Sequence, residues 1–309
     1  MSSKKIFLAR IQGFCSGVAT AIEIVELALK KYGTPLYVYH EIVHNTFVVD
    51  AFRKRGVIFI ENIADAPEGS RIVFSAHGIS PAVIKEADDR NLNYIDATCP
   101  LVKKVHREAV RFSKQGRHVM LIGHKGHEEI VGTSGYVRPE LLHYIQNTDD
   151  IRNLNLSKDT PAAYVTQTTL SADDAMQLIR ELKHKFPDIQ GPDKDDICYA
   201  TQSRQDAVKE LADCCDAIII CGSPNSSNSN RLRETGEHAG IPSYIIDHAD
   251  ELNLNWIRDQ QTIGISSGAS VPEYIVNDLI ERIRLSFPGT LVETIGQTHE
   301  PKIFPLPEI

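Results

Sequence analysis

Three cysteines in this 309-residue chain, Cys15, Cys99 and Cys198, each stand directly before a stretch that has the pattern of a helix. They are 84 and 99 residues apart, whereas the ligands of a local zinc finger are separated by only a few residues. A helix N-terminus lowers the pKa of a thiol, so any one of them could act as a nucleophile. One nucleophile would not explain three equivalent positions. Three thiolates that converge in the fold would instead suit a soft metal centre.

The number of these thiols limits the metal centres that they could hold. A four-iron cluster normally takes four cysteines, so three would leave one iron without a protein ligand and able to bind a substrate as a Lewis acid. A zinc ion with three cysteines and a water is the competing assignment. The other cysteines, Cys214, Cys215 and Cys221, have no counterparts elsewhere in the chain and are interpreted as core or incidental residues.

The three cysteines begin similar passages, and these predict the fold. Each helical stretch leads to a short apolar strand of the kind found in buried parallel sheets: LYVYH, HVMLIGH and AIIICG. Each passage ends in another strand and a helix start: FSAHGIS, VTQTTLS and GISSGAS. The repeat predicts an α/β protein of three similar units with parallel sheets, in a pseudo-threefold arrangement around one central space. A two-domain α/β protein with the cysteines in its cores is the alternative.

The expected unit boundaries follow from the repeat. We place the first unit, which includes the N-terminal strand, at 1–97, the second at 98–195, the third at 196–285, and a C-terminal tail at 286–309. Three serines are expected to cap helices, because Pro81 follows the first and an acidic residue stands three positions after each of the others: Ser80, Ser171 and Ser270.

Polar residues follow the first strand of each passage, 28 or 29 residues after its cysteine: His44, His127 and Ser226. Ligands of parallel α/β sheets bind beyond the carboxyl ends of the strands. Imidazole, hydroxyl and amide donors there could hold a phosphate or diphosphate, and the candidates are His44, His77, His127, Ser226, Ser227 and Asn228. The alternatives are a helix cap and turn for the serines, and a zinc site formed by the three histidines with Glu129.

Glu129 follows His127 by two residues and would lie in the same central space. Burial there would raise the pKa of its carboxyl, so that Glu129 could carry a proton at neutral pH and act as a general acid. Thr168, in TQTTLS, could relay that proton or orient the substrate. An acid in the first turn of a helix, favoured by the helix dipole, is the alternative for Glu129.

Charge and hydropathy exclude several classes of partner. The formal net charge of −8 argues against nucleic acid and anionic membrane surfaces, which need a basic face. No apolar run approaches the length of a membrane helix, and the N-terminal residues lack the pattern of a signal peptide. We therefore expect a cytoplasmic protein with reduced cysteines.

Nine motifs resemble those of the 4-hydroxy-3-methylbut-2-enyl diphosphate reductase family, the last enzymes of the non-mevalonate isoprenoid pathway. They are GFCSGV, HEIVHN, FSAHG, DATCPLV, IGHKGHEE, TQTTLS, DDICYATQSRQ, NSSNSNRL and GASVPE, and the match runs from about residue 6 to residue 285. The resemblance implies three α/β units around a central iron–sulfur site, with Cys15, Cys99 and Cys198 as ligands of a [4Fe-4S] cluster with one open iron. Oxidative loss of that iron would leave a [3Fe-4S] form.

The resemblance also implies roles for the polar residues. A diphosphate would be held by His44, His77, Ser226, Ser227, Asn228 and Ser270; His127 and Thr168 would lie near the substrate, and Glu129 would donate a proton. The reaction is the loss of a hydroxyl from an allylic diphosphate with two electrons and two protons. Because the chain has no G-x-G-x-x-G dinucleotide motif, we expect an external one-electron donor, ferredoxin or flavodoxin. The rivals are a non-catalytic iron–sulfur sensor and a zinc-dependent hydrolase.

Overall fold

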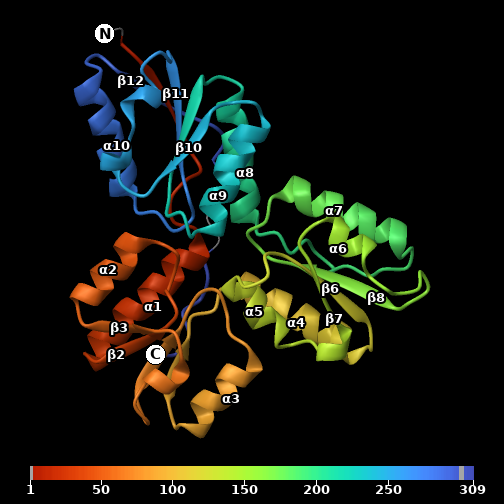
Figure 1. Cartoon of the computed structure of the whole chain (residues 1–309). Coiled ribbons are helices and arrows are strands. Elements are labelled where there is room, and N and C mark those ends of the chain that lie inside the picture. The colour runs from red at the N-terminus through yellow and green to blue at the C-terminus, as the bar shows by residue number, and fades with distance from the viewer. Residues whose placement is uncertain (1–2, 299–302) are drawn as a thin grey trace. The chain divides into compact units, whose positions relative to one another are not determined.

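Helices alternate with strands in three separate sheets in the computed structural model, which describes residues 3–298 and 303–309 (Figure 1). Every strand pair in this described part of the chain is parallel. Parallel neighbours need long crossovers, usually helices. The α/β class with three small parallel sheets, predicted from the repeat, is confirmed.

The five-stranded sheet has the order β10–β9–β11–β1–β12. Its strands are β1 (Lys5–Ala9), β9 (Ala217–Cys221), β10 (Ser243–Ile246), β11 (Thr262–Ser267) and β12 (Leu291–Ile295), and its helices are α8 (Tyr199–Ala212), α9 (Ser227–His238) and α10 (Glu273–Ser286). Alternate residues of β9 serve the two faces: Ile218 lies in the core with α8, and Ile219 in the core with α10. This two-sided burial explains the continuous apolar run AIIIC.

The four-stranded sheet has the order β3–β2–β4–β5. Its strands are β2 (Leu36–Tyr39), β3 (Val57–Ile60), β4 (Arg71–Phe74) and β5 (Asn93–Asp96), and the neighbouring helices in the chain are α1 (Ser16–Tyr32), α2 (Thr46–Lys54) and α3 (Pro81–Asp89). Gly33 ends α1 in the left-handed conformation, at φ 72°, which glycine adopts readily just after a helix.

The three-stranded sheet has the order β7–β6–β8. Its strands are β6 (His118–Ile122), β7 (Leu142–Ile145) and β8 (Ala162–Thr166), and its helices are α4 (Pro100–Lys114), α5 (Glu128–Ser134), α6 (Thr148–Arg152) and α7 (Ala172–Lys185). Val119 packs with α4 and Met120 with α7, so both faces of β6 are buried. Short 3₁₀ turns occur at Ile63–Asp65, Pro139–Leu141, Ala249–Glu251 and Leu254–Trp256.

The expected place of the N-terminal strand was wrong. We assigned it to the first unit, but β1 pairs with β11 and β12 in the five-stranded sheet. The reason is the phase of the repeat: a strand that stands before a cysteine completes the sheet of the preceding passage, as β5, before Cys99, pairs with β4. Cys15 belongs to the first passage, so β1 completes the sheet of the last. The exact unit boundaries stay a prediction.

The C-terminal tail contributes a strand although its sequence is weakly periodic. β12 pairs with β1 at the edge of the five-stranded sheet, and its residues are exposed or half-buried. An edge position requires neither a continuous apolar run nor strict alternation. Residues 299–302 of the tail lie outside the described part of the chain.

Two of the three predicted serine caps are confirmed, and one is wrong. The hydroxyl of Ser80 accepts from the Val83 N–H at the start of α3, and that of Ser171 from the Asp174 N–H at the start of α7. Ser270 does not cap α10, because Pro272 occupies the cap position. The Ser270 hydroxyl instead donates to the carbonyl of His44, at 2.8 Å.

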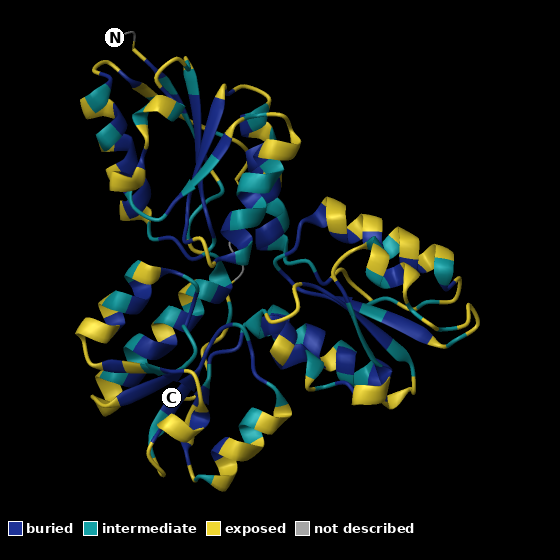
Figure 2. Cartoon of the chain, in the orientation of Figure 1, coloured by how far each residue is buried: buried dark blue, intermediate teal, exposed yellow. Residues whose placement is uncertain are grey.

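The chain forms two compact units, which we describe separately. The one-sheet unit contains the described residues within 1–19, 44–50 and 199–303, and the two-sheet unit those within 20–43, 51–198 and 304–309. Figure 2 shows the strands largely buried and the outer faces of the helices exposed. No helix in residues 3–298 or 303–309 is both long and apolar enough for a membrane span.

Candidate active-site residues at the strand ends

The three cysteines have the same local structure. The backbone N–H of Cys15 donates to the carbonyl of Ala269, that of Cys99 to Ala76 and that of Cys198 to Thr168, each at 3.1 Å. In every case the acceptor is the second residue beyond a strand, since β11 ends at Ser267, β4 at Phe74 and β8 at Thr166. Each thiol therefore lies at the carboxyl end of a different sheet, immediately before a helix. The sequence predicted this repetition. Cys99 and Cys198 lie in the two-sheet unit, and Cys15 lies in the one-sheet unit.

The side chains of these cysteines differ from those of the other three. Cys15, Cys99 and Cys198 are half-buried, whereas Cys215 and Cys221 are buried in the core. Burial raises the pKa of the Cys221 thiol to about 12, so that thiol stays protonated and unsuited to bind a metal. None of the six forms a disulfide within the described residues. Cys214 is exposed but has no counterpart in the repeat, so Cys15, Cys99 and Cys198 are the accessible thiols that share one local structure.

The one-sheet unit places Ser226, Ser227 and Asn228 at the N-terminus of α9. The Ser226 hydroxyl caps the helix by accepting from the Ser229 N–H, at 3.3 Å. Asn228 is 5% exposed, and its amide oxygen and nitrogen have no hydrogen-bond partner among the described residues. A buried amide normally finds partners. The unsatisfied amide therefore fits a site that a polar ligand completes.

The same helix end approaches its sheet closely. A Cβ on Gly222 would lie 2.2 Å, and one on Gly268 2.1 Å, from the Ser229 hydroxyl. Both glycines follow the carboxyl ends of their strands, β9 and β11. Their missing side chains let the N-terminus of α9, with its N–H groups, rest directly on those strand ends.

The two-sheet unit places His77 and His127 near one another. Their ring centres are 6.0 Å apart. His127 is the cap residue of α5, and its Nδ1 accepts from the Glu129 N–H at 3.2 Å. An accepting Nδ1 carries no proton, so this cap requires the neutral tautomer with its hydrogen on Nε2. His127 thus offers an Nε2–H donor, and protonation would disrupt the cap.

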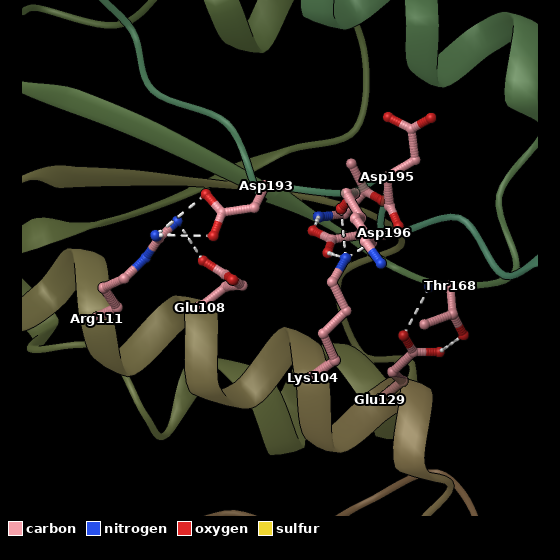
Figure 3. A network of polar contacts seen from close by, with 10 residues as sticks. Lys104, Glu108, Arg111, Glu129, Thr168, Asp193, Asp195 and Asp196 are labelled. Carbon is pink, nitrogen blue, oxygen red and sulfur yellow. Dashed lines mark hydrogen bonds and ion pairs between the residues drawn. The ribbon is translucent and has the colours of Figure 1, made fainter.

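Glu129 and Thr168 form a closed pair in the two-sheet unit (Figure 3). One carboxyl oxygen of Glu129, Oε1, accepts from the Thr168 N–H at 2.6 Å, and the other, Oε2, contacts Thr168 Oγ1 at 3.0 Å. Glu129 is 2% exposed. Burial raises its pKa to about 7, against the opposing effect of both hydrogen bonds, and the nearby negative charge of Asp196 acts in the same direction as burial. The expected rise of this pKa is present.

The two hydrogen bonds of Glu129 respond differently to a proton on its carboxyl. Because an N–H can only donate, Oε1 must keep a lone pair toward Thr168 in both protonation states. In the bond to Oε2 the Thr168 hydroxyl donates to the carboxyl. A proton carried by Oε2 would reverse this bond, with Oε2 donating to Thr168 Oγ1.

Two polar residues that sequence reasoning did not select also lie at these strand ends. Gln167 is 1% exposed, and its amide oxygen accepts from the His124 N–H at 3.1 Å while its amide nitrogen donates to Thr169. Glu128 stands with a carboxyl oxygen 3.9 Å from Nε2 of His77. Gln167 lies within TQTTLS, so its position beside Thr168 was the available signal.

The fold and the site define the class of protein: a parallel α/β protein with one thiol at the carboxyl end of each sheet. His44, Ser226, Ser227, Asn228 and Ser270 accompany Cys15 in the one-sheet unit, and His77, His127, Glu129 and Thr168 accompany the other two cysteines. The roles predicted for these residues stay predictions.

The chain matches the family described as LytB protein over residues 6–284 and belongs to that family. It is 49% identical over 308 residues to the 4-hydroxy-3-methylbut-2-enyl diphosphate reductase of Azoarcus sp., covering 100% of this chain and 98% of the relative. It is 52% identical over 283 residues to the reductase of Pseudomonas aeruginosa, covering 91% and 90%. The resemblance inferred from the motifs is thus confirmed.

Two solved structures have a similar fold. One is the E-1-hydroxy-2-methyl-but-2-enyl-4-diphosphate reductase from Plasmodium falciparum, with a TM-score of 0.96 and 36% identity over 99% of this chain and 96% of that one. The other is an (E)-4-hydroxy-3-methyl-but-2-enyl diphosphate reductase described as the terminal enzyme of the non-mevalonate pathway. Its TM-score is 0.64, with 32% identity over 91% and 99% of the two chains.

Proposed function

We propose that this chain is a 4-hydroxy-3-methylbut-2-enyl diphosphate reductase, which removes the allylic hydroxyl with two electrons and two protons to give isopentenyl and dimethylallyl diphosphates. This would be the last step of the non-mevalonate isoprenoid pathway. The names of the relatives support the reaction. The observation that carries the proposal is the threefold repetition of a half-buried cysteine, held by the same backbone bond beyond three strands.

Cys15, Cys99 and Cys198 fit the ligands of a [4Fe-4S] cluster. They are soft, accessible donors directly before helices, and the core cysteines Cys215 and Cys221 are excluded by burial. When bound, such a cluster with one open iron supplies electrons singly and Lewis acidity toward the substrate hydroxyl. Zinc bound to three thiolates would supply no electrons.

The substrate diphosphate is assigned to uncharged donors. In the one-sheet unit these are the residues at the start of α9, together with His44 and Ser270, whose hydroxyl bonds the His44 carbonyl. The buried, unsatisfied amide of Asn228 is the strongest support, because it offers a donor that no described residue uses. In the two-sheet unit His77 and the Nε2–H of His127 are the corresponding donors. Helix N-termini add favourable N–H groups.

Glu129 is assigned the proton for the departing oxygen, delivered through Thr168. A pKa of about 7 keeps roughly half of the carboxyl protonated at neutral pH. Thr168 fixes the acid geometry through its N–H and passes the proton through its hydroxyl. The electrons are assigned to an external one-electron donor, ferredoxin or flavodoxin, because the sequence carries no dinucleotide-binding motif.

An anaerobic assay tests this function. Protein purified without oxygen should contain about three to four iron and sulfide per chain, as expected for this cluster type, and should convert the diphosphate substrate when supplied with reduced ferredoxin. Iron and sulfide with substrate binding but without turnover would indicate a sensor. Stoichiometric zinc would contradict the proposal and favour a hydrolase.

Replacement of Asn228 by alanine should raise the KM for the diphosphate about tenfold, the usual effect of removing one ligand hydrogen bond. The melting temperature should stay the same or rise, because a buried amide without partners is removed. Replacement of Asn255, which is exposed, is the control and should change neither quantity. A lower melting temperature with an unchanged KM would make Asn228 a structural residue.

A further inference from the structure

The segment before Cys198 is attached to its sheet differently from the segments before the other two cysteines. β1 leads to Cys15 and pairs with β11, and β5 leads to Cys99 and pairs with β4. The three-stranded sheet has no such strand. Its counterpart among the described residues is an isolated bridge between Ala163 and Gln190, followed by irregular chain up to Cys198.

A buried carboxylate takes the place of the missing strand. Oδ2 of Asp196 accepts from the N–H of Thr166, at 3.0 Å. Two residues further along both segments, the N–H of Cys198 donates to the carbonyl of Thr168, at 3.1 Å. This two-residue spacing is that of a parallel ladder. A side-chain oxygen of Asp196 thus accepts a hydrogen bond from the neighbouring strand, as a backbone carbonyl would in a paired strand.

A lysine of α4 holds this carboxylate and the chain around it (Figure 3). Nζ of Lys104 contacts Oδ1 of Asp196 at 3.0 Å and donates to the carbonyls of Asp195, at 2.9 Å, and Lys194. The Asp196 side chain is fully buried, and that of Lys104 is 23% exposed. All three donors of the ammonium group therefore face one short segment. Since α4 starts directly after Cys99, Lys104 links that helix to the approach to Cys198.

We propose that Lys104 and Asp196 are positioning residues that hold Cys198, as strand pairing holds Cys15 and Cys99. The Asp196 bond also fixes Thr166, two residues before Thr168, and so the partner of Glu129. The role of Cys198 as a metal ligand rests on the proposed function. The way in which Lys104 and Asp196 attach its segment is independent of that function. Removal of Lys104 leaves Asp196 as a buried, uncompensated charge. Removal of the Asp196 charge leaves the half-buried ammonium group of Lys104 without its ion-pair partner, so each change should loosen the same segment.

The chain offers a matched control three residues upstream. Arg111, also on α4, contacts Asp193 at 3.2 Å, and Figure 3 shows it reaching the same segment as Lys104. Asp193 is 78% exposed and Arg111 38% exposed, and ion pairs between exposed groups contribute little. Asp193→Asn therefore removes a contact between the same two parts of the chain without creating a buried charge.

Hydrogen–deuterium exchange of the full-length holoenzyme tests the proposal. In Lys104→Met, the Thr166 and Cys198 amides should exchange about tenfold faster, while the amides of β5 before Cys99 keep their wild-type rates. Asp196→Asn keeps an acceptor for Thr166 but loses the charge, so it should show a smaller increase of the same kind. Lys104→Arg should restore slow exchange, and Asp193→Asn should resemble the wild type.

Kinetics and iron content supply independent readouts. In Lys104→Met we expect kcat to fall about tenfold with KM for the diphosphate nearly unchanged, and iron per chain to decrease. Unchanged exchange at Thr166 and Cys198 in both Lys104→Met and Asp196→Asn would overturn the proposal, as would an equal effect of Asp193→Asn. If wild-type protein lacks iron and turnover, the proposed function fails, while the exchange rates still decide whether this pair positions the segment.

Discussion

Replacement of Glu129 by glutamine is expected to reduce turnover 100- to 10,000-fold, the usual contribution of a general acid. Glutamine preserves the contacts, because its oxygen can accept from the Thr168 N–H and its amide can donate to Thr168 Oγ1, as the protonated carboxyl does. It cannot release a proton. Iron and sulfide per chain should be unchanged, and product formation under anaerobic single-turnover conditions is the measurement.

The same variant should change how stability depends on pH. Because the pKa of Glu129 is about 7 in the folded protein and about 4.5 in an unfolded chain, the folded state binds the proton more tightly. Its contribution to stability is complete below pH 4.5 and is lost as the pH rises through 7. The glutamine variant has no group that titrates at this position, so its stability does not fall for this reason between pH 4.5 and pH 7. At pH 8.5 the variant should therefore be more stable than the wild type, by up to about 3 kcal/mol, with almost no difference at pH 4.

Denaturant unfolding at pH 5 and pH 8.5 separates these effects from general damage. Replacement of the exposed Glu140 by glutamine is the control and should change neither turnover nor the pH dependence. A glutamine variant at 129 that is equally destabilised at both pH values, or that retains turnover, would contradict the assignment of the proton donor.

Replacement of Cys99 by serine should lower activity more than 1,000-fold, because an alcohol oxygen is a poor ligand for iron in a sulfide cluster. Iron and acid-labile sulfide per chain should fall sharply, and the visible absorption of the cluster should be lost. Serine is similar in size, and Cys99 is half-buried before α4, so the melting temperature of cluster-free protein should change little.

Cys214 provides the matched control for this experiment. It is exposed and has no counterpart in the repeat, so Cys214→Ser should keep the iron, the sulfide and the activity of the wild type. Full iron content and turnover in Cys99→Ser would remove Cys99 from the ligand set. Loss of iron from Cys214→Ser to the same extent would show that the assay reports general fragility.

Local structure could be predicted from the sequence because it depends on neighbours a few residues away. The apolar runs predicted β2, β6 and β9. Ser80 and Ser171 cap helices as their spacing indicated. Ser270 has the same spacing, yet Pro272 caps α10 and Ser270 bonds the carbonyl of His44, a partner that local sequence does not reveal.

The amino-acid sequence by itself determined the parallel α/β class, the recurrence of the three cysteines and the resemblance to one family. The reason is that repeated helix starts and apolar strands are visible in the sequence as a periodic pattern. Only the tertiary structure decided which sheet β1 completes, how Glu129 is buried against Thr168, and that Asp196 and Lys104 replace a strand before Cys198. Pairing register, burial and charge compensation join residues far apart in the chain. They are therefore properties of the packed molecule, which local periodicity does not specify.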